Sequence, residues 1–440
     1  MTTSPALAST ALADHADAVC SDLREQDRLW DKGFTRRRFL QGVGMAGVAA
    51  LGTQLVTTRV AFADTASTNG NTLIVVFLRG GCDWLRVLVP NASSLGLDYL
   101  KSVRPNLLPA ASSLLPLAGA GGWAANAKMA PLMPLWGSGE MSFVPAVATS
   151  PTRSHFDAQR FLETGGAPTT TNGWLDRLLT SIGPGTTFRA VSSGYSSPAS
   201  MLGTEQKLTM ASLSDFVVPS WGDDYAARTA TAVESLYRGL PGSLPEDVAG
   251  TVQALGTAAD ARAGAGVQNG AVYPTNNSFA KSLSDLATML RAEVGLQVAT
   301  VDVGGWDTHT DEANDLDNNV DAVAKSLAAF MTDLGPKRRS RVTVAVMSEF
   351  GRRVGQNGSG GSDHGYGGLM WLLGGGLSAS QVAGTWNPLA KSTLDQGDVP
   401  ALNSPFAVLG EIATTRLGAG SLTSVFPGAS LSPLRLTRRT

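Results

Sequence analysis

The sequence predicts an α/β protein built on a mostly parallel central sheet. Four apolar runs rich in β-branched residues are typical of strands buried on both faces. These runs cover residues 73–78, 141–148, 297–303 and 341–347. Helical patterns, with apolar side chains three and four positions apart, cover residues 278–294 and 314–334. Strands that alternate with helices in this way favour an α/β fold.

The remaining chain is interpreted element by element. The first strand ends in a glycine-rich turn, Arg79-Gly80-Gly81-Cys82-Asp83. Residues 369–373 are interpreted as a further strand, closed by three glycines, and residues 406–417 as a helix. The glycine triplet lacks the spacing of a dinucleotide fingerprint, which disfavours an NAD enzyme. Two stretches rich in Ala, Gly and Ser, residues 110–127 and 258–270, are expected to be loops.

Composition excludes coiled-coil, collagen and disulfide-scaffold proteins and argues against a nucleic-acid binder. The 440 residues carry 34 Lys and Arg against 36 Asp and Glu, a formal charge of −2. This balance argues against a nucleic-acid binder held by phosphate contacts. With 43% hydrophobic and 16% charged residues, the chain is expected to bury a large core as one or two domains.

An export signal is predicted at the N-terminus. Residues 35–41 (TRRRFLQ) fit the twin-arginine pattern, an apolar run follows over residues 42–56, and Ala61-Phe62-Ala63 is a small-x-small cleavage site. A transmembrane anchor is the alternative, but the uncharged run is marginally short for a span of about 20 residues. We therefore expect a signal peptide over residues 1–63 and a single domain over residues 64–440.

This signal has consequences for location and cofactors. The twin-arginine translocase would be a partner during export, and the mature protein would be periplasmic or extracellular with no stable membrane span. Cys20 would be removed, so the remaining Cys82 can form no internal disulfide. Because this route carries proteins that are already folded, it favours a metalloprotein.

Histidines mark the expected chemistry. Outside the export segment the chain has His155, His309 and His364, each with an Asp within two positions and each beside a predicted strand. One such histidine would ordinarily be structural, but the carboxyl ends of parallel strands meet in one crevice. Together with carboxylates they predict a site for one or two divalent ions, with Zn, Mn, Mg and Ca as candidates. The expected ligands are Asp83, Asp307, His309, Glu349, Asp363 and His364.

The segment after the second strand carries the candidate catalytic groups. Ser154 precedes a helical stretch, where backbone donors and the helix dipole suit a nucleophile or an anion site. Arg153 can pair with an oxyanion such as phosphate or sulfate. The alternative use of Ser154 or Thr152 is to cap the helix.

Five segments, taken in order, resemble a family of exported bacterial proteins of unknown function that is similar to a distant branch of the alkaline phosphatase and sulfatase superfamily. They are residues 77–83 (FLRGGCD), 153–159 (RSHFDAQ), 304–309 (GGWDTH), 348–352 (SEFGR) and 363–365 (DHG). The resemblance implies a three-layer αβα fold. It also implies one or two divalent ions at the carboxyl edge of the sheet and activity on phosphate or sulfate esters.

The resemblance assigns individual roles. Asp83 resembles a metal-binding aspartate of the first strand, and Asp307 with His309 resembles a pair that binds the other ion. Where relatives have Ser-Asp-His-Gly, this chain offers either residues 348–351 (SEFG) or residues 362–365 (SDHG), and only one of them can match. In the first register Glu349 can bind a metal but Phe350 cannot.

The nucleophile has two candidates. Thr149 stands where a sulfatase has its modified residue, whereas the family's own pattern centres on Ser154. Because no Cys occurs in this segment, conversion of Cys to formylglycine is excluded there.

We therefore expect an exported metal-dependent hydrolase of phosphate or related sulfate esters. Ser154 would be the nucleophile, Arg153 would steer the anion, and His155 would be a ligand or a general acid. The expected ligand is a small anionic ester or an envelope polymer. The rival hypothesis is a non-catalytic, metal-stabilised binding protein for a polysaccharide, a protein or an envelope component.

Overall fold

The computed structural model describes residues 70–149, 152–217, 223–238, 244–264 and 266–438, so the predicted export segment lies outside the described residues. The chain divides into two compact units. One comprises residues 1–59 and 218–252, of which α8 (Asp223–Tyr237) and the first part of α9 (Leu244–Ala263) are described. The other comprises residues 60–217 and 253–440, and it contains both sheets.

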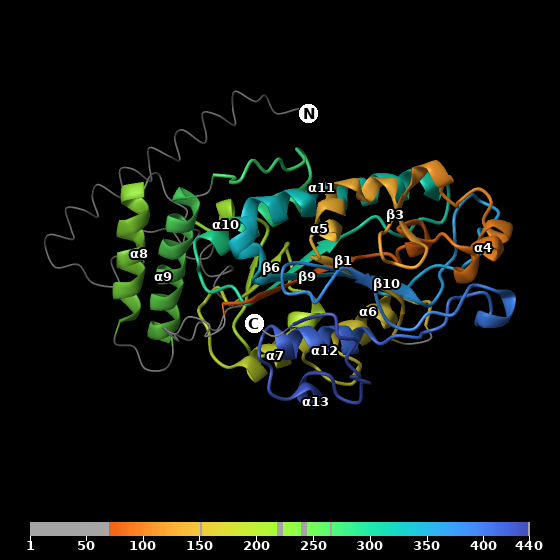
Figure 1. Cartoon of the computed structure of the whole chain (residues 1–440). Helices are drawn as coiled ribbons and strands as arrows, with labels where there is room; N and C mark the ends of the chain where they lie inside the picture. The colour runs from red at the N-terminus through yellow and green to blue at the C-terminus, as the bar shows by residue number, and fades with distance from the viewer. Residues whose placement is uncertain (1–69, 150–151, 218–222, 239–243, 265, 439–440) are drawn as a thin grey trace, which may run out of the picture. The chain divides into compact units, whose positions relative to one another are not determined.

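An eight-stranded sheet forms the centre of this second unit (Figure 1). From one edge to the other its strands are β11 (Gln381–Val382), β5 (Met141–Val147), β10 (Gly368–Leu373), β9 (Val342–Ser348), β1 (Thr72–Leu78), β8 (Val298–Val303), β6 (Ala190–Ser193) and β7 (Leu208–Met210). Every described pairing is parallel except those of β10, which runs antiparallel to both β5 and β9. The prediction of a mostly parallel sheet is confirmed.

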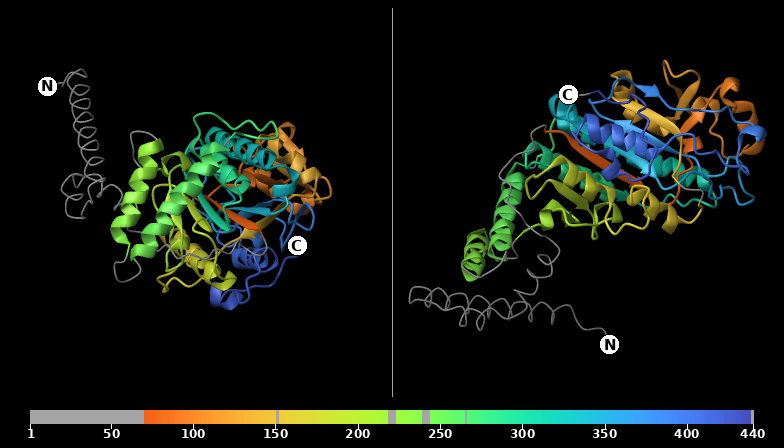
Figure 2. Two further views of the ribbon diagram at one scale, coloured as in Figure 1. Left: turned by 90° about the vertical axis from the view of Figure 1, so that its left-hand side faces the viewer. Right: turned by 90° about the horizontal axis from the view of Figure 1, so that it is seen from below.

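Helices cover both faces of the sheet because successive side chains of a strand point to opposite sides. Ile74, Val76 and Leu78 of β1 pack in a core with α10 (Ser278–Arg291) and α11 (Glu312–Arg339). Leu73, Val75 and Phe77 face the second layer. That layer contains α7 (Trp174–Ile182), α12 (Pro405–Thr415) and α13 (Leu422–Val425). Figure 2, seen from below, shows α12 in blue across this face.

The remaining elements border these layers. A second, antiparallel sheet has the order β2 (Leu88–Pro90), β4 (Trp123–Asn126) and β3 (Leu114–Pro116). The other helices are α4 (Leu97–Val103), α5 (Met133–Gly137) and α6 (His155–Glu163). α11 is kinked at Gly335, which has a φ of 65° and precedes Pro336.

Sequence predictions of the long elements match the structure, and those of the short ones needed correction. The four predicted strands correspond to β1, β5, β8 and β9, and residues 369–373 lie in β10. Residues 110–127 were expected to be a loop, but they contain β3 and β4. The second expected loop, residues 258–270, begins inside α9. These segments are short or Ala-rich, so no strong apolar period marks them.

In the described part of the chain, no helix combines the length and apolar character that a bilayer crossing demands. Cys82 is buried and free there, as expected for the one cysteine of the predicted mature chain.

Candidate metal centre

Strand direction brings five loops to one edge of the large sheet. β1, β5, β8 and β9 run the same way, so the loops that follow them leave from the same edge. β10 runs the opposite way, which places the loop before it, containing His364, at that edge as well. Residues far apart in the sequence therefore meet here, at the position where α/β proteins commonly bind ligands.

Three side chains that could hold a metal ion converge there. One potential ligand atom from each of His155, Asp307 and His364 lies within 4.8 Å of the other two. His364 Nε2 is 3.0 Å from Asp307 Oδ1, and His155 Nε2 is 3.4 Å from Asp307 Oδ2. His309 joins them, since its Nε2 lies 3.0 Å from both His364 Nε2 and Asp307 Oδ1.

The imidazoles of His155 and His364 are each held by a contact at Nδ1, on the side of the ring away from the cluster. His155 Nδ1 lies 2.8 Å from Glu349 Oε1, and His364 Nδ1 lies 2.9 Å from the carbonyl oxygen of Arg153. With Nδ1 engaged in such a contact, Nε2 is the nitrogen of each ring that faces the cluster and would bind a metal. This arrangement is typical of histidines that bind metals.

Glu349, which the sequence predicts as a ligand, contacts His155 from the side opposite the cluster. Its buried Oε1 also accepts from the backbone N–H of Gly80 at 2.9 Å and from Gln159 Nε2 at 2.8 Å, while Oε2 accepts from Ser348 Oγ at 3.0 Å. Burial favours a raised pKa for this carboxyl, but the hydrogen bonds from Gln159, the backbone, His155 and Ser348 outweigh it and lower the pKa. Glu349 is therefore an ionised carboxylate, and both of its oxygens already accept hydrogen bonds.

Asp83, also predicted as a ligand, has a buried arginine as its partner. It is fully buried and paired with Arg104, whose Nη1 lies 2.7 Å from Asp83 Oδ2. Glu312 lies beside Asp83 and accepts from Ser362 Oγ at 2.6 Å. Burial and the charge of Asp83 raise the pKa of Glu312 to about 9, so Glu312 is neutral at pH 7. Asp83 thus belongs to a buried acid pair outside the histidine cluster.

Asp363 lies at the periphery. Its side chain is 56% exposed, its Oδ1 is 3.9 Å from His309 Nδ1, and the same oxygen accepts from Asn357 Nδ2 at 3.1 Å. Of the two registers left open by the sequence, the one at residues 362–365 brings a side chain, that of His364, into the cluster.

Arg352 controls the charge of the cluster. Its buried guanidinium places Nη2 2.6 Å from Asp307 Oδ1. Burial alone would raise the pKa of Asp307, but hydrogen bonds from His364 and Arg352 and the Arg352 charge lower it to about 2. Burial and the same charge lower the pKa of His309. An ionised carboxylate and neutral imidazoles are the forms that bind metal.

The residues present fit a divalent cation. His155 Nε2 is buried and has no hydrogen-bond partner among the described residues. One ligand atom from each of His155, Asp307 and His364 lies within 4.8 Å of the other two, and individual pairs in the cluster lie 3.0–3.4 Å apart. Ligand atoms of a tetrahedral site with bonds of about 2.0–2.1 Å lie roughly 3.3–3.4 Å apart. Imidazole and carboxylate donors suit Zn or another first-row divalent ion. Phe350 packs its buried ring 4.9 Å from that of His155, so it forms an apolar wall, as its chemistry requires.

The expected catalytic segment has a structural use in its own right. Ser154 caps α6, its Oγ accepting from the backbone N–H of Asp157 at 3.4 Å, and Thr152 Oγ1 accepts from the N–H of Ser154 at 3.1 Å. Arg153 directs its guanidinium to Asp398. Thr149 Oγ1 is buried with no hydrogen-bond partner in the described residues.

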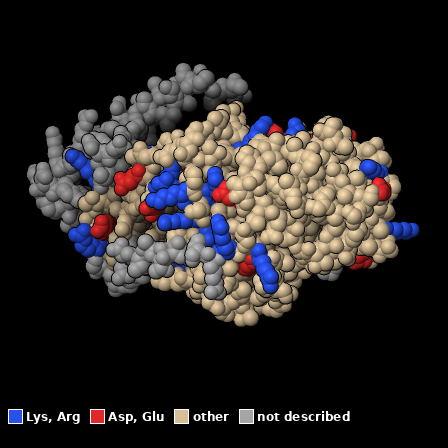
Figure 3. All heavy atoms as spheres, viewed as in Figure 1, with Lys and Arg blue, Asp and Glu red and all other residues tan. Residues whose placement is uncertain are grey.

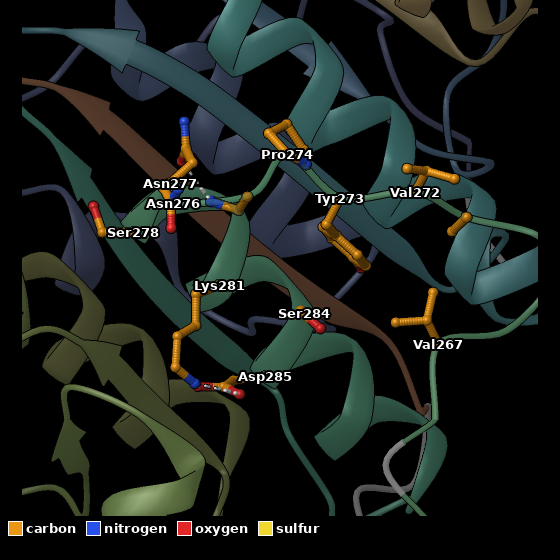
Figure 4. Close-up of a pocket in the computed structure, with 12 residues that line it drawn as sticks. Val267, Val272, Tyr273, Pro274, Asn276, Asn277, Ser278, Lys281, Ser284 and Asp285 are labelled. Atoms are coloured by element: carbon orange, nitrogen blue, oxygen red, sulfur yellow. Dashed lines mark hydrogen bonds and ion pairs between the residues drawn. The ribbon is translucent and has the colours of Figure 1, made fainter.

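An open groove of about 720 Å³ lies apart from this cluster, at the start of α10 (Figure 4). Val267, Val272 and Tyr273 line it, and Lys281 pairs with Asp285 at its rim at 3.3 Å. It contains none of the histidines, so it is a feature separate from the metal centre.

Sequence reasoning missed the supporting residues. Gln159 donates to Glu349, Glu312 lies beside Asp83, and Asp398 pairs with Arg153. Each is an ordinary polar residue in the sequence. Gln159 stands in the RSHFDAQ segment four positions after His155, so both lie on one side of α6. That spacing was the available signal for a residue that shares the Glu349 contact.

The chain belongs to a family of proteins of unknown function, DUF1501, whose model matches residues 139–417. The match includes the four cluster residues but not Asp83. No curated protein matches the chain. Among solved structures, the chain is similar to the lipoteichoic acid synthase LtaP from Listeria monocytogenes, with 10% identity and a TM-score of 0.31 over 89% of this chain and 80% of that one.

Replacing Glu349 by Gln should weaken metal binding by roughly 10–100-fold, the usual effect of losing such a supporting carboxylate. The amide is neutral, so it no longer makes the His155 imidazole more basic. Competition titration with a chromogenic chelator measures this. Glu140→Gln, which removes a carboxylate paired with Arg339, is the matched control. Equal affinities for both variants would contradict the supporting role.

Replacing Glu312 by Gln should flatten the dependence of stability on pH. The pKa of Glu312 is higher in the folded protein than its ordinary value of 4.5, so wild-type stability falls as pH rises from about 4.5 towards 9. Gln keeps the hydrogen-bond donor to Asp83 and the acceptor for Ser362 without titrating. Thermal melting should give similar midpoints at pH 5 and a higher midpoint for the variant at pH 8. Asp321→Asn on the same helix is the control, and a lower midpoint for Glu312→Gln at pH 8 would refute the neutral form.

Proposed function

We propose that this protein is an exported, metal-dependent hydrolase of phosphate esters or related sulfate esters. The observation that carries the proposal is the convergence of His155, Asp307 and His364, with His309 beside them. Three imidazoles and an ionised carboxylate, open enough that Asp307 is 48% exposed, form a site that can hold a cation and admit a ligand. The mostly parallel sheet and the site at its carboxyl edge support an alkaline-phosphatase-like fold.

Each residue has a role in this proposal. His155, Asp307, His309 and His364 would hold the cation, which would supply Lewis-acid chemistry by polarising the ester and offsetting charge that develops on its oxygens. Glu349 and the carbonyl of Arg153 keep His155 and His364 oriented. Phe350 excludes water from one side of the cluster.

Ser154 is the proposed nucleophile. It is adjacent to His155 at the first turn of α6, where the helix dipole stabilises an alkoxide and a bound anion. Its hydrogen bond to the helix is long, at 3.4 Å, so the cap is weakly made and the hydroxyl can exchange it for a substrate.

We also propose export through the twin-arginine translocase, supported by residues 35–41, with the mature protein in the periplasm or outside the cell. The rival role, a metal-stabilised binding protein, is favoured by one observation. The hydroxyls of Thr152 and Ser154 both serve the start of α6.

The first test combines metal analysis with an ester panel on protein prepared in its native host. We expect at least one equivalent of a divalent metal, and turnover of one of p-nitrophenyl phosphate, bis-p-nitrophenyl phosphate and p-nitrophenyl sulfate that chelation abolishes. Asp307→Ala with His364→Ala should remove the metal, whereas Asp321→Ala should not. A folded double variant that keeps its metal would contradict the proposed site. Metal without turnover would favour the binding role.

Ser154→Ala separates the nucleophile from the cap. Loss of a helix cap costs about 1 kcal/mol of stability and would leave turnover largely intact, whereas loss of a nucleophile should lower kcat by several orders of magnitude with the metal retained. Steady-state kinetics and metal content of the same preparation decide between them. Turnover within tenfold of wild type would reduce Ser154 to a capping residue.

A further inference from the structure

Two arginines share a single buried carboxylate beside the metal centre. Arg153 Nε lies 3.2 Å from Asp398 Oδ2, and Arg353 Nε lies 3.4 Å from Asp398 Oδ1. The Asp398 side chain is only 4% exposed, whereas those of Arg153 and Arg353 are 46% and 41% exposed. One buried acceptor thus fixes two guanidinium groups that both reach solvent. We call Arg153 and Arg353 the arginine pair.

Both arginines lie next to residues of the metal centre in the chain or in space. The carbonyl of Arg153 accepts from His364 Nδ1 at 2.9 Å, and Ser154 and His155 follow it in the chain. Arg353 follows Arg352, and its backbone N–H donates to the carbonyl of Asp363 at 2.9 Å. Both guanidinium groups therefore lie within one side-chain length of loops that carry cluster residues.

The arginine pair keeps a net positive charge and N–H donors that no acceptor among the described residues engages. One carboxylate offsets one of the two positive charges. Arg353 Nη2 donates to the carbonyl of Gln396, but within the described ranges the Nη1 groups of both arginines make no hydrogen bond. The nearby Asp363 carboxylate contacts Asn357 and His309. Guanidinium groups with free N–H donors in a planar fork match the oxygens of phosphate and sulfate.

We propose that the arginine pair is a second anion-binding subsite, so that the substrate carries another phosphate-like group besides the ester that reacts at the metal centre. This substrate class, a bisphosphate or a polymer with repeating anionic groups, rests on the proposed function. Anion binding by the pair does not, because it uses neither the metal nor the nucleophile.

Two exposed arginines far from the metal centre supply an internal control. Arg341 lies just before β9, and the Nη2 of Arg438 donates to the carbonyl of Gly375 at 3.1 Å, so both lie at the opposite edge of the sheet from the metal centre. Figure 3 shows several Lys and Arg side chains near one another on the visible face, with Asp and Glu side chains among them. A surface of this kind attracts anions without positioning them.

The test is calorimetry with inorganic tripolyphosphate on metal-free protein. We expect one equivalent to bind, Arg353→Gln to weaken it roughly tenfold or more, and Arg353→Lys to weaken it less. Arg160→Gln removes an exposed charge from α6. Arg341→Gln with Arg438→Gln removes the two exposed charges at the opposite edge of the sheet. Both should stay within twofold of wild type. Unchanged melting temperatures confirm that the variants fold.

Three results would overturn the proposal: no binding by the wild type, equal weakening by Arg160→Gln, or loss of binding only in the Arg341 and Arg438 variant. A kinetic arm tests the substrate class, since Arg353→Gln should raise KM more for a bisphosphate than for the monophosphate of the same alcohol. If no ester turns over but Arg353→Gln still abolishes binding, the subsite stands and the proposed function fails. If esters turn over and the KM values rise equally, the subsite fails and the proposed function stands.

Discussion

A single buried guanidinium, that of Arg352, holds together loops of the candidate metal centre. Its nitrogens donate to the carbonyls of Gly81 at 2.5 Å, Gly80 at 2.6 Å, Ser362 at 3.0 Å and Trp306 at 3.2 Å, and to Asp307. These acceptors come from the loops after β1 and β8 and from the loop before β10. A fully buried charge is tolerable only when its donors are satisfied in this way. The loops that carry Asp307, His309 and His364 are therefore held together by one cation, whereas His155 reaches them from α6.

Glycine makes this closeness possible. A Cβ on Gly365 would lie 2.4 Å from the backbone carbon of Arg352, and one on Gly81, at a φ of 72°, would lie 2.4 Å from the Phe350 ring. A larger residue at either position would push a loop away from Arg352. A second buried group, Arg104 with Asp83, supports the same loops, since its Nη2 donates to the carbonyl of Arg353 at 2.7 Å. Two buried arginines, Arg352 and Arg104, thus support the loops of the candidate metal centre.

The sequence was sufficient for the long strands, the two main helices and the edge at which the histidines meet, because these follow from apolar periodicity and strand polarity. It was insufficient for the roles of individual carboxylates. Glu349 and Asp83 both follow buried strands, as a ligand would. The register that places Leu78 opposite Ser348 brings the N–H of Gly80 to Glu349, and a salt bridge from α4's C-cap, Arg104, engages Asp83. Such long-range contacts leave no local pattern in the sequence.

The central claim is that His155, Asp307 and His364 hold a divalent cation with Glu349 behind them. An anomalous-difference map, from crystals of protein prepared in its native host and recorded on both sides of the metal's absorption edge, tests it most directly. We expect a peak within about 2.0–2.2 Å of His155 Nε2, His364 Nε2 and an oxygen of Asp307. A peak on Asp83 and Glu312 with the histidines unliganded, or no peak in a preparation that contains the metal, would contradict it.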